Sequence, residues 1–189
     1  MRSKTVATLD CETDPFKEAR IPEPFCFGVY WRTKARTHYR QFWNDDPETL
    51  ADEVADFLRD KNWRVYAHNG GKFDFFFLLK HADNVTGING RIAKMTVGRC
   101  LLVDSFLILP VALKAFNKQE FDYTKLERAV RDRHRDEILD YLKSDCVNLY
   151  DWIERFREIF GTPLTMASAA FSQMRECGID IEKHRSESW

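Results

Sequence analysis

The sequence has no excess of charge of either sign, because 29 lysine and arginine residues are balanced by 30 aspartate and glutamate residues. A net charge of −1 over 189 residues argues against a protein that binds nucleic acid through its overall charge. Basic residues gather in one cluster, whose members are Lys125, Arg128, Arg131, Arg133, His134 and Arg135. This cluster is interpreted as the solvated face of a helix, with contact to phosphates as the alternative.

The sequence also lacks any Cys-x-x-Cys pair and any Cys/His spacing typical of zinc sites, because its five cysteines are widely scattered. The five cysteines are therefore interpreted as reduced thiols, most of them buried. No apolar run approaches the length of a membrane span, and strand-like sequence begins too close to residue 1 to leave room for a secretory signal. We therefore expect a soluble protein of the cytoplasm, without internal repeats.

What the sequence does contain is a series of short apolar runs and one long amphipathic pattern. Strands are expected at residues 5–13, 25–31, 38–43, 64–68, 92–97 and 101–104. Helices are expected at residues 47–59, 75–79 and 136–160, with a further helix that starts at residues 162–163 and breaks at Gly178. Residues 105–116 are expected to form a connector and a short helix.

The first strand carries two acids on one face. Side chains alternate along a strand, so Asp10 and Glu12 point the same way as Val6 and Thr8. Their Cα atoms would lie roughly 6.5 to 7 Å apart, near enough for both carboxylates to reach one cation or a pair of cations. The alternative is a strand that simply ends in polar residues.

A second acid-bearing segment follows the strand at residues 64–68. Residues 69–74 read Asn-Gly-Gly-Lys-Phe-Asp, a glycine-containing turn that leads into a very apolar helix. Asp74 at the head of this helix would complement the helix dipole, or it would serve as a metal ligand. Asn69 is a turn residue or a hydrogen-bonding group for a substrate.

The third segment is the long helix near the C-terminus. Its apolar stripe consists of Ile138, Tyr141, Leu142, Asp145, Leu149, Trp152, Phe156 and Ile159. Asp145 is the exception in this stripe, because a buried carboxylate is costly unless a cation or a hydrogen-bond network compensates it. Tyr141 lies one turn before Asp145, so its hydroxyl group projects from the same face.

Four carboxylates that converge would repel one another unless they bind cations. Ligand sets made of oxygen alone, without histidine or cysteine, favour Mg²⁺ or Mn²⁺ over zinc. Two such ions serve the hydrolysis of a phosphodiester, one by activating water and the other by stabilising the leaving oxygen. The acids Asp10, Glu12, Asp74 and Asp145 therefore predict a site for two divalent cations.

These residues form a pattern that resembles the three motifs of the DEDDy 3′-to-5′ exonucleases. The motifs are Asp10-x-Glu12, Asn69-x-x-x-Phe73-Asp74 and Tyr141-x-x-x-Asp145. The wording of residues 68–74 (HNGGKFD) and 141–145 (YLKSD) is most similar to the exonuclease domain of protein-primed family B DNA polymerases. The resemblance implies an α/β fold of the RNase H-like (DnaQ-like) type, with a mixed central sheet flanked by helices.

The resemblance also implies roles for individual residues. Asp10, Glu12, Asp74 and Asp145 would bind the metals, and the Tyr141 hydroxyl would orient the attacking water. Residues that would contact the 3′ end of single-stranded DNA are Thr13, Asn69, Phe73, Ser105 and Phe106, with phenylalanine at 106 where the family has leucine. Lys118 would assist catalysis electrostatically.

The resemblance spans roughly residues 5–175, so residues 1–178 are expected to form a single exonuclease domain and residues 179–189 a polar tail. The chain has no polymerase motif, and it is interpreted as a stand-alone exonuclease or as the exonuclease part of a larger polymerase. The expected activity is release of nucleoside 5′-monophosphates from the 3′ end of single-stranded DNA, as in proofreading. The alternatives are the same chemistry on RNA, or a non-catalytic module that binds single strands or a partner.

Overall fold

A seven-stranded mixed sheet forms the centre of the computed structural model, which describes residues 4–15, 20–111 and 120–179. The strand order is β3-β2-β1-β4-β7-β6-β5, with β4 parallel to both β1 and β7 and the other pairs antiparallel. The strands are β1 (Thr5–Thr13), β2 (Pro24–Arg32), β3 (Thr37–Trp43), β4 (Trp63–Ala67), β5 (Asn84–Ile88), β6 (Arg91–Val97) and β7 (Cys100–Asp104).

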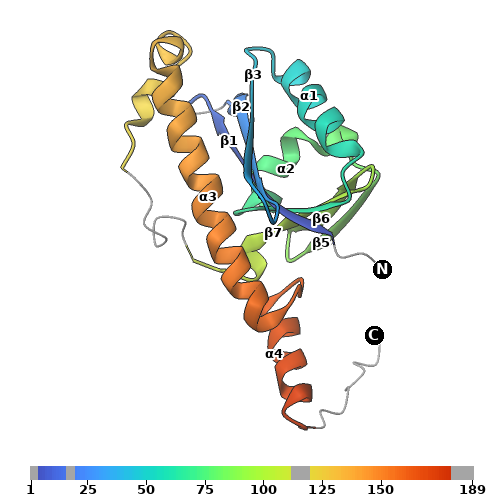
Figure 1. Ribbon diagram of the computed structural model, residues 1–189. Helices are drawn as coiled ribbons and strands as arrows, with labels where there is room; N and C mark the ends of the chain where they lie inside the picture. Colours follow the sequence, from blue (N-terminus) through green and yellow to red (C-terminus); the bar gives the residue numbers. More distant parts are fainter. Residues whose placement is uncertain (1–3, 16–19, 112–119, 180–189) are drawn as a thin grey trace.

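Helices cover both faces of this sheet (Figure 1). Helices α1 (Pro47–Arg59) and α2 (Asp74–Phe77) lie on one face, and the 26-residue α3 (Arg135–Phe160) crosses the other. Helix α4 (Met166–Glu176) continues from the end of α3 beyond the sheet. None of the helices that the structure describes is long and apolar enough to cross a membrane.

The alternation expected along β1 is confirmed. Ala7, Leu9 and Cys11 belong to the core between the sheet and α1, whereas Val6 packs in the core beneath α3. On the α3 face, the Thr8 hydroxyl donates a hydrogen bond of 2.7 Å to the carbonyl oxygen of Cys146. The acids of β1 share this face, so they lie on the side of the sheet that α3 covers.

Helix α1 begins where the sequence indicates. Pro47 is the first helical residue, and the Asp46 side chain accepts a hydrogen bond of 2.7 Å from the Thr49 backbone N–H. Helix α4 begins later than expected, at Met166 instead of residues 162–163. Its start is set by a capping box in which Thr165 and Ser168 each accept a hydrogen bond from the other's backbone N–H.

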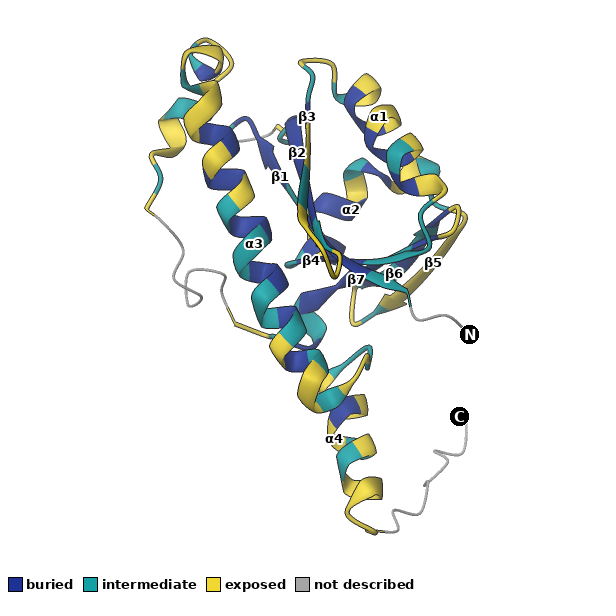
Figure 2. Cartoon of the chain, in the orientation of Figure 1, coloured by how far each residue is buried: buried dark blue, intermediate teal, exposed yellow. Residues whose placement is uncertain are grey.

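The predicted apolar stripe of α3 is wrong at its C-terminal end. Leu149 and Phe156 are buried, but Ile159 is 63% exposed and Trp152 is half-buried. Figure 2 shows the colouring change from buried to exposed along α3 as the helix passes the edge of the sheet. Trp152 is only half-buried because the buried stripe passes through Ile153, whereas Ile159 is exposed because it lies beyond the sheet.

The expectation of a helix face for residues 125–135 is also wrong. The structure has two short 3₁₀ helices, Tyr123–Leu126 and Arg131–His134, in place of one continuous helix. Arg131 is buried, pairs with Asp45 and lies over the Phe25 ring at 4.3 Å, so it is not available to a phosphate. A guanidinium attached to a methylene stem can cover an aromatic ring in this way.

Strand β5 was missed because an edge strand needs little apolar surface. Four of its five residues are exposed, so the alternation that marks a half-buried strand is weak. The connector expected at residues 105–116 begins with a single turn, Ser105–Leu107. Residues 112–119 and the predicted tail from residue 180 lie outside the described residues.

The packing of α3 generates a matched pair of stability predictions. Replacing Leu149 with alanine removes a buried side chain beneath the helix and should lower the free energy of unfolding by about 2–5 kcal/mol. Replacing the exposed Ile159 with alanine on the same helix should change it by less than about 0.5 kcal/mol. Urea denaturation followed by circular dichroism measures both, and equal losses would contradict the position of the sheet edge.

Candidate active site

Three of the predicted metal ligands converge where α3 crosses the C-terminal half of β1. Asp10, Glu12 and Asp145 each offer a carboxylate oxygen, and these oxygens all lie within 4.8 Å of one another. Close contact between the helix and the sheet makes this possible. Gly28 pairs with Asp10 across β1 and β2, and a Cβ atom at position 28 would lie 3.1 Å from Leu142 Cγ of α3.

Asp74 lies apart from this group of three oxygens, at the start of α2. Its carboxyl group is 2% exposed and hydrogen-bonded to the thiol of Cys11, on the other face of β1 from Asp10. Its Oδ1 atom is buried and has no hydrogen-bond partner among residues 4–15, 20–111 and 120–179. Burial raises the pKa of Asp74 to about 6, although the Cys11 thiol and a backbone N–H lower it. The one-turn helix therefore compensates only part of the cost of burial.

All four acids nevertheless act electrostatically on one buried thiol. The pKa of Cys146 is raised first by burial and then by the charges of Asp10, Asp145, Asp74 and Glu12. The four predicted ligands thus form one region of negative potential across β1, α2 and α3. Oxygen donors alone, together with the unsatisfied Oδ1 of Asp74, fit a hard divalent cation such as Mg²⁺ or Mn²⁺.

Tyr141 faces the acids from one turn earlier on α3. Its hydroxyl oxygen lies 3.0 Å from that of Tyr123, and its ring stacks on Phe121 at 4.3 Å. Burial, then the hydrogen bond with Tyr123 and then the charge of Asp145 raise the pKa of Tyr141 well above its usual range. The group therefore remains a neutral hydroxyl at physiological pH, able to donate a hydrogen bond.

Tyr123 was not among the predicted site residues. The signal in the sequence is weak, an aromatic pair at positions 121 and 123 in the polar segment after Lys118. In the structure Phe121 packs edge-on to Tyr123 at 5.7 Å and supports Tyr141 from beneath. Tyr123 is 51% exposed, so it connects the buried Tyr141 to the surface.

A pocket of about 240 Å³ opens beside the acids. It is lined by Cys11, Glu12, Thr13, Asp14, Pro15, Phe73, Tyr123 and Leu126. Two predicted substrate contacts, Thr13 and Phe73, thus lie next to the predicted metal ligand Glu12. Phe73 is supported edge-on by Phe77 at 5.2 Å, and Tyr123 contributes a second aromatic ring to the wall.

The other predicted substrate contacts do not line this pocket. Asn69 has a left-handed backbone (φ 59°) and accepts a hydrogen bond of 2.8 Å from Arg91. Ser105 is fully buried, donates a hydrogen bond of 3.2 Å to the Ala67 carbonyl oxygen and lies 3.1 Å from His68 Nδ1. Phe106 packs against the Arg91 guanidinium. Lys118 lies outside the described residues, so its role stays a prediction.

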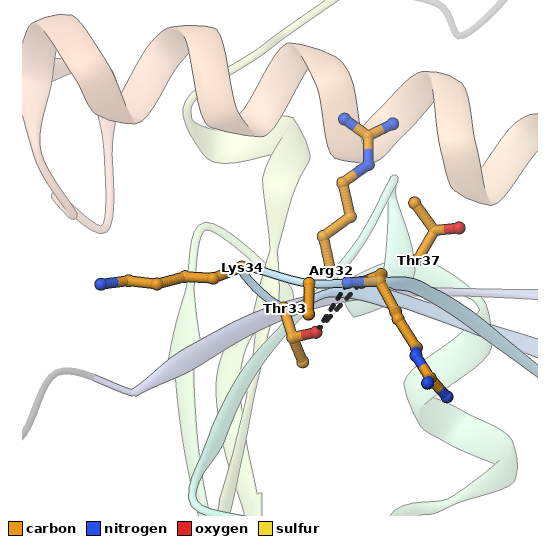
Figure 3. Close-up of a pocket in the computed structure, with 6 residues that line it drawn as sticks. Arg32, Thr33, Lys34 and Thr37 are labelled. Atoms are coloured by element: carbon orange, nitrogen blue, oxygen red, sulfur yellow. Dashed lines mark hydrogen bonds between the residues drawn. The ribbon is translucent and has the colours of Figure 1, made fainter.

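A larger hollow, about 560 Å³, lies at the turn between β2 and β3 (Figure 3). Its walls are Arg32, Thr33, Lys34, Ala35, Arg36 and Thr37, and the Arg32 side chain points towards α3, where it pairs with Asp151 at 2.7 Å. The register of β1 and β2 places this turn near Ala7, roughly 16 Å along the strand from Glu12. The described residues that line it include no carboxylate. Because this hollow offers no carboxylate to a metal ion, the smaller pocket beside the acids is the better candidate for the active site.

Comparison with known proteins identifies a relative. Over 173 residues, 90% of its length, the chain is 40% identical to the DNA-directed DNA polymerase of Enterobacteria phage PRD1. This chain is a relative of the PRD1 DNA polymerase. It spans 30% of that polymerase, and no protein-family model matches the chain. The resemblance inferred from the three motifs is confirmed by this similarity.

Solved structures confirm the fold. The phi29 DNA polymerase in complex with primer-template DNA and incoming nucleotides matches 94% of this chain with a TM-score of 0.68 and 16% identity. The same polymerase in complex with single-stranded DNA matches 93% with a TM-score of 0.66 and 15% identity. In both cases the match covers 35% of the polymerase chain. This chain thus has the predicted RNase H-like fold, a mixed sheet flanked by helices.

The raised pKa of Asp74 predicts how the stability of the metal-free protein depends on pH. The folded pKa of about 6 exceeds the unfolded value of about 3.9, so between these values the unfolded state loses its proton first. Ionisation of Asp74 should therefore lower the free energy of unfolding as pH rises from about 4 to 6. The loss should reach on the order of 3 kcal/mol above pH 6.

The variant Asp74→Asn should remove this dependence. In EDTA, its advantage in stability over the wild type should be absent near pH 4, grow up to pH 6 and stay level above. Urea denaturation across this pH range measures the difference, with the exposed Asp56→Asn as the control. A difference that does not vary with pH would contradict the burial of an ionised Asp74.

Proposed function

We propose that this chain is a metal-dependent 3′-to-5′ exonuclease that releases nucleoside 5′-monophosphates from the 3′ end of single-stranded DNA. The observation that carries the proposal is the convergence of Asp10, Glu12 and Asp145 beside a pocket walled by Phe73 and Tyr123. A cluster of acids alone would be consistent with many proteins. Acids next to an aromatic-walled pocket fit an enzyme that hydrolyses a polyanion with stackable bases.

Two divalent cations, Mg²⁺ or Mn²⁺, would be held by Asp10, Glu12, Asp74 and Asp145. When bound, such ions neutralise the phosphate, activate a water molecule and stabilise the leaving 3′ oxygen. Binding would also relieve the cost of keeping a buried carboxylate at position 74. Metal binding would therefore stabilise the folded site as well as support the reaction.

Tyr141 would orient the attacking water. Its hydroxyl stays protonated and is held by Tyr123 at 3.0 Å and by the stacked Phe121 ring, so it has little freedom to turn away from the acids. A fixed hydroxyl lowers the barrier by holding water in the geometry for in-line attack. Lys118 would add positive charge near the transition state.

The substrate would enter the pocket as a single strand. Phe73 and Tyr123 offer faces or edges on which bases can stack without regard to sequence, and Thr13 lies beside Glu12 to contact the terminal nucleotide. Asn69 and Phe106 would contact the strand further along, whereas the fully buried Ser105 would support them from within the protein. DNA is favoured over RNA because the PRD1 and phi29 relatives are DNA polymerases. The setting would be proofreading during DNA replication in the cytoplasm, together with a polymerase domain or subunit.

The proposal is tested with a 5′-labelled single-stranded oligonucleotide and purified protein in Mg²⁺, Mn²⁺ or EDTA. We expect a ladder that shortens from the 3′ end, needs metal and is lost in the Asp10→Ala/Glu12→Ala double variant. Asp52→Ala, at an exposed acid of α1, is the control for loss of charge. An intact oligonucleotide at all wild-type concentrations would contradict the proposal, and an RNA strand of the same sequence tests the choice of sugar.

The role of Tyr141 makes a separate prediction. Tyr141→Phe should lower kcat by about 10²-fold with little change in KM, because the ring and its stacking remain while the hydroxyl is lost. Tyr150→Phe, on the same helix and packed against Tyr30 away from the acids, is the matched control. Single-turnover digestion measures both rates, and an unchanged rate in Tyr141→Phe would remove the hydroxyl from the mechanism.

A further inference from the structure

Arg91 at the start of β6 contacts three groups that the site depends on. Its side chain is 8% exposed, and it donates hydrogen bonds of 2.9 Å to Asp104 Oδ2 and 2.8 Å to Asn69 Oδ1. Its guanidinium carbon lies 4.4 Å from the centre of the Phe106 ring. Two of these partners, Asn69 and Phe106, are predicted to contact the substrate, and they come from different segments of the chain.

The backbone around Asn69 is held rigidly. Asp104 is fully buried and accepts a hydrogen bond of 3.0 Å from the Phe106 backbone N–H, and the backbone of Gly71 and Asn69 also lowers its pKa. Gly71 is packed so closely that a Cβ atom there would lie 1.9 Å from the Ile92 carbonyl oxygen. The turn at residues 69–71 therefore has little freedom, and Arg91 holds the one flexible part, the Asn69 side chain.

The contact with Arg91 decides which end of the Asn69 amide is free. A guanidinium has five N–H donors and no acceptor, so the group facing it must be the amide oxygen. The amide nitrogen, with its two N–H donors, then points away from Arg91. A strand at Asn69 would meet a donor and not an acceptor.

We propose that Arg91 is a positioning residue that fixes Asn69 as a hydrogen-bond donor, so that Asn69 recognises an acceptor oxygen of the nucleic-acid strand. The stacked guanidinium fixes the Phe106 ring in the same step. Phosphate, sugar and base-carbonyl oxygens are acceptors of this kind, and a base amino group is not. This inference rests on the proposed function for its substrate, a single-stranded nucleic acid.

Three variants separate positioning from simple neutralisation of Asp104. Arg91→Lys keeps a cation for Asp104 but loses the planar fork that reaches Asn69 and Phe106 together. Asn69→Ala removes the amide, and Asn69→Asp keeps an oxygen for Arg91 but removes the donor. Arg99→Lys, at an exposed arginine of the turn between β6 and β7, is the matched control.

The Kd for a labelled single-stranded oligonucleotide is measured by fluorescence anisotropy in EDTA, and KM and kcat are measured in Mg²⁺. We expect Asn69→Ala, Asn69→Asp and Arg91→Lys each to raise Kd and KM on the order of tenfold, with kcat within about threefold of wild type. The Kd of the Arg91→Lys/Asn69→Ala double variant should be no higher than that of Arg91→Lys alone, because both changes remove the same contact of Asn69 with the strand. Asn69→Ala should lower the melting temperature by a few degrees, because alanine at a left-handed φ is strained, whereas Asn69→Asp keeps an acceptor for Arg91 and should stay near wild type.

The inference is overturned if Asn69→Asp has the same Kd as wild type. It is also overturned if Arg91→Lys keeps the wild-type Kd while Asn69→Ala raises it. It is also overturned if the wild type binds no single strand. If Arg91→Lys does not fold, the two Asn69 variants still test the donor. Binding with the expected order but without any hydrolysis would instead contradict the proposed exonuclease activity and leave the inference supported.

Discussion

The structure depends on the contact between α3 and the centre of the sheet. The Thr8 hydroxyl donates to the Cys146 carbonyl oxygen, the Cys146 thiol donates to the Gly28 carbonyl oxygen at 3.5 Å, and Gly28 leaves room for Leu142. These contacts set the height and rotation of the helix over β1. Because Asp145 precedes Cys146, they also bring its carboxylate to Asp10 and Glu12. Packing of an apolar stripe and assembly of a charged site are thus one event.

Burial of an acid lowers stability, and the buried acids near the site differ in the partners that offset this loss. Asp104 has partners within the protein, Arg91 and the Phe106 backbone N–H, although burial still raises its pKa. Asp74 is only partly compensated, since one of its buried oxygens has no hydrogen-bond partner in the part of the chain that the structure describes. This contrast between the two carboxylates fits a structural role for Asp104 and the proposed metal-binding role for Asp74.

Aromatic side chains connect the acids to the surface. Phe121 stacks on Tyr141, and Tyr123 packs edge-on to both rings and reaches the pocket. Phe73, from the segment that carries Asp74, lines the same pocket. The same segment begins with Asn69, whose side chain is oriented by Arg91 of a different strand. A short segment therefore carries both a proposed metal ligand and proposed substrate contacts, and side chains of β6 and β7 pack against it.

Local periodicity by itself determined the strands β1 to β4, β6 and β7, the helix α1, the face of Asp10 and Glu12, and the one-turn spacing of Tyr141 and Asp145. These follow from alternation along a strand and from 3.6 residues per helical turn, which neighbouring residues specify. Only the tertiary structure decided that Asp74 contacts Cys11, that Arg131 is buried over Phe25, that Ile159 lies beyond the sheet, and that Tyr123 and Arg91 hold Tyr141 and Asn69. Each of these contacts joins segments far apart in the chain, and no local pattern records which partner a side chain meets after folding.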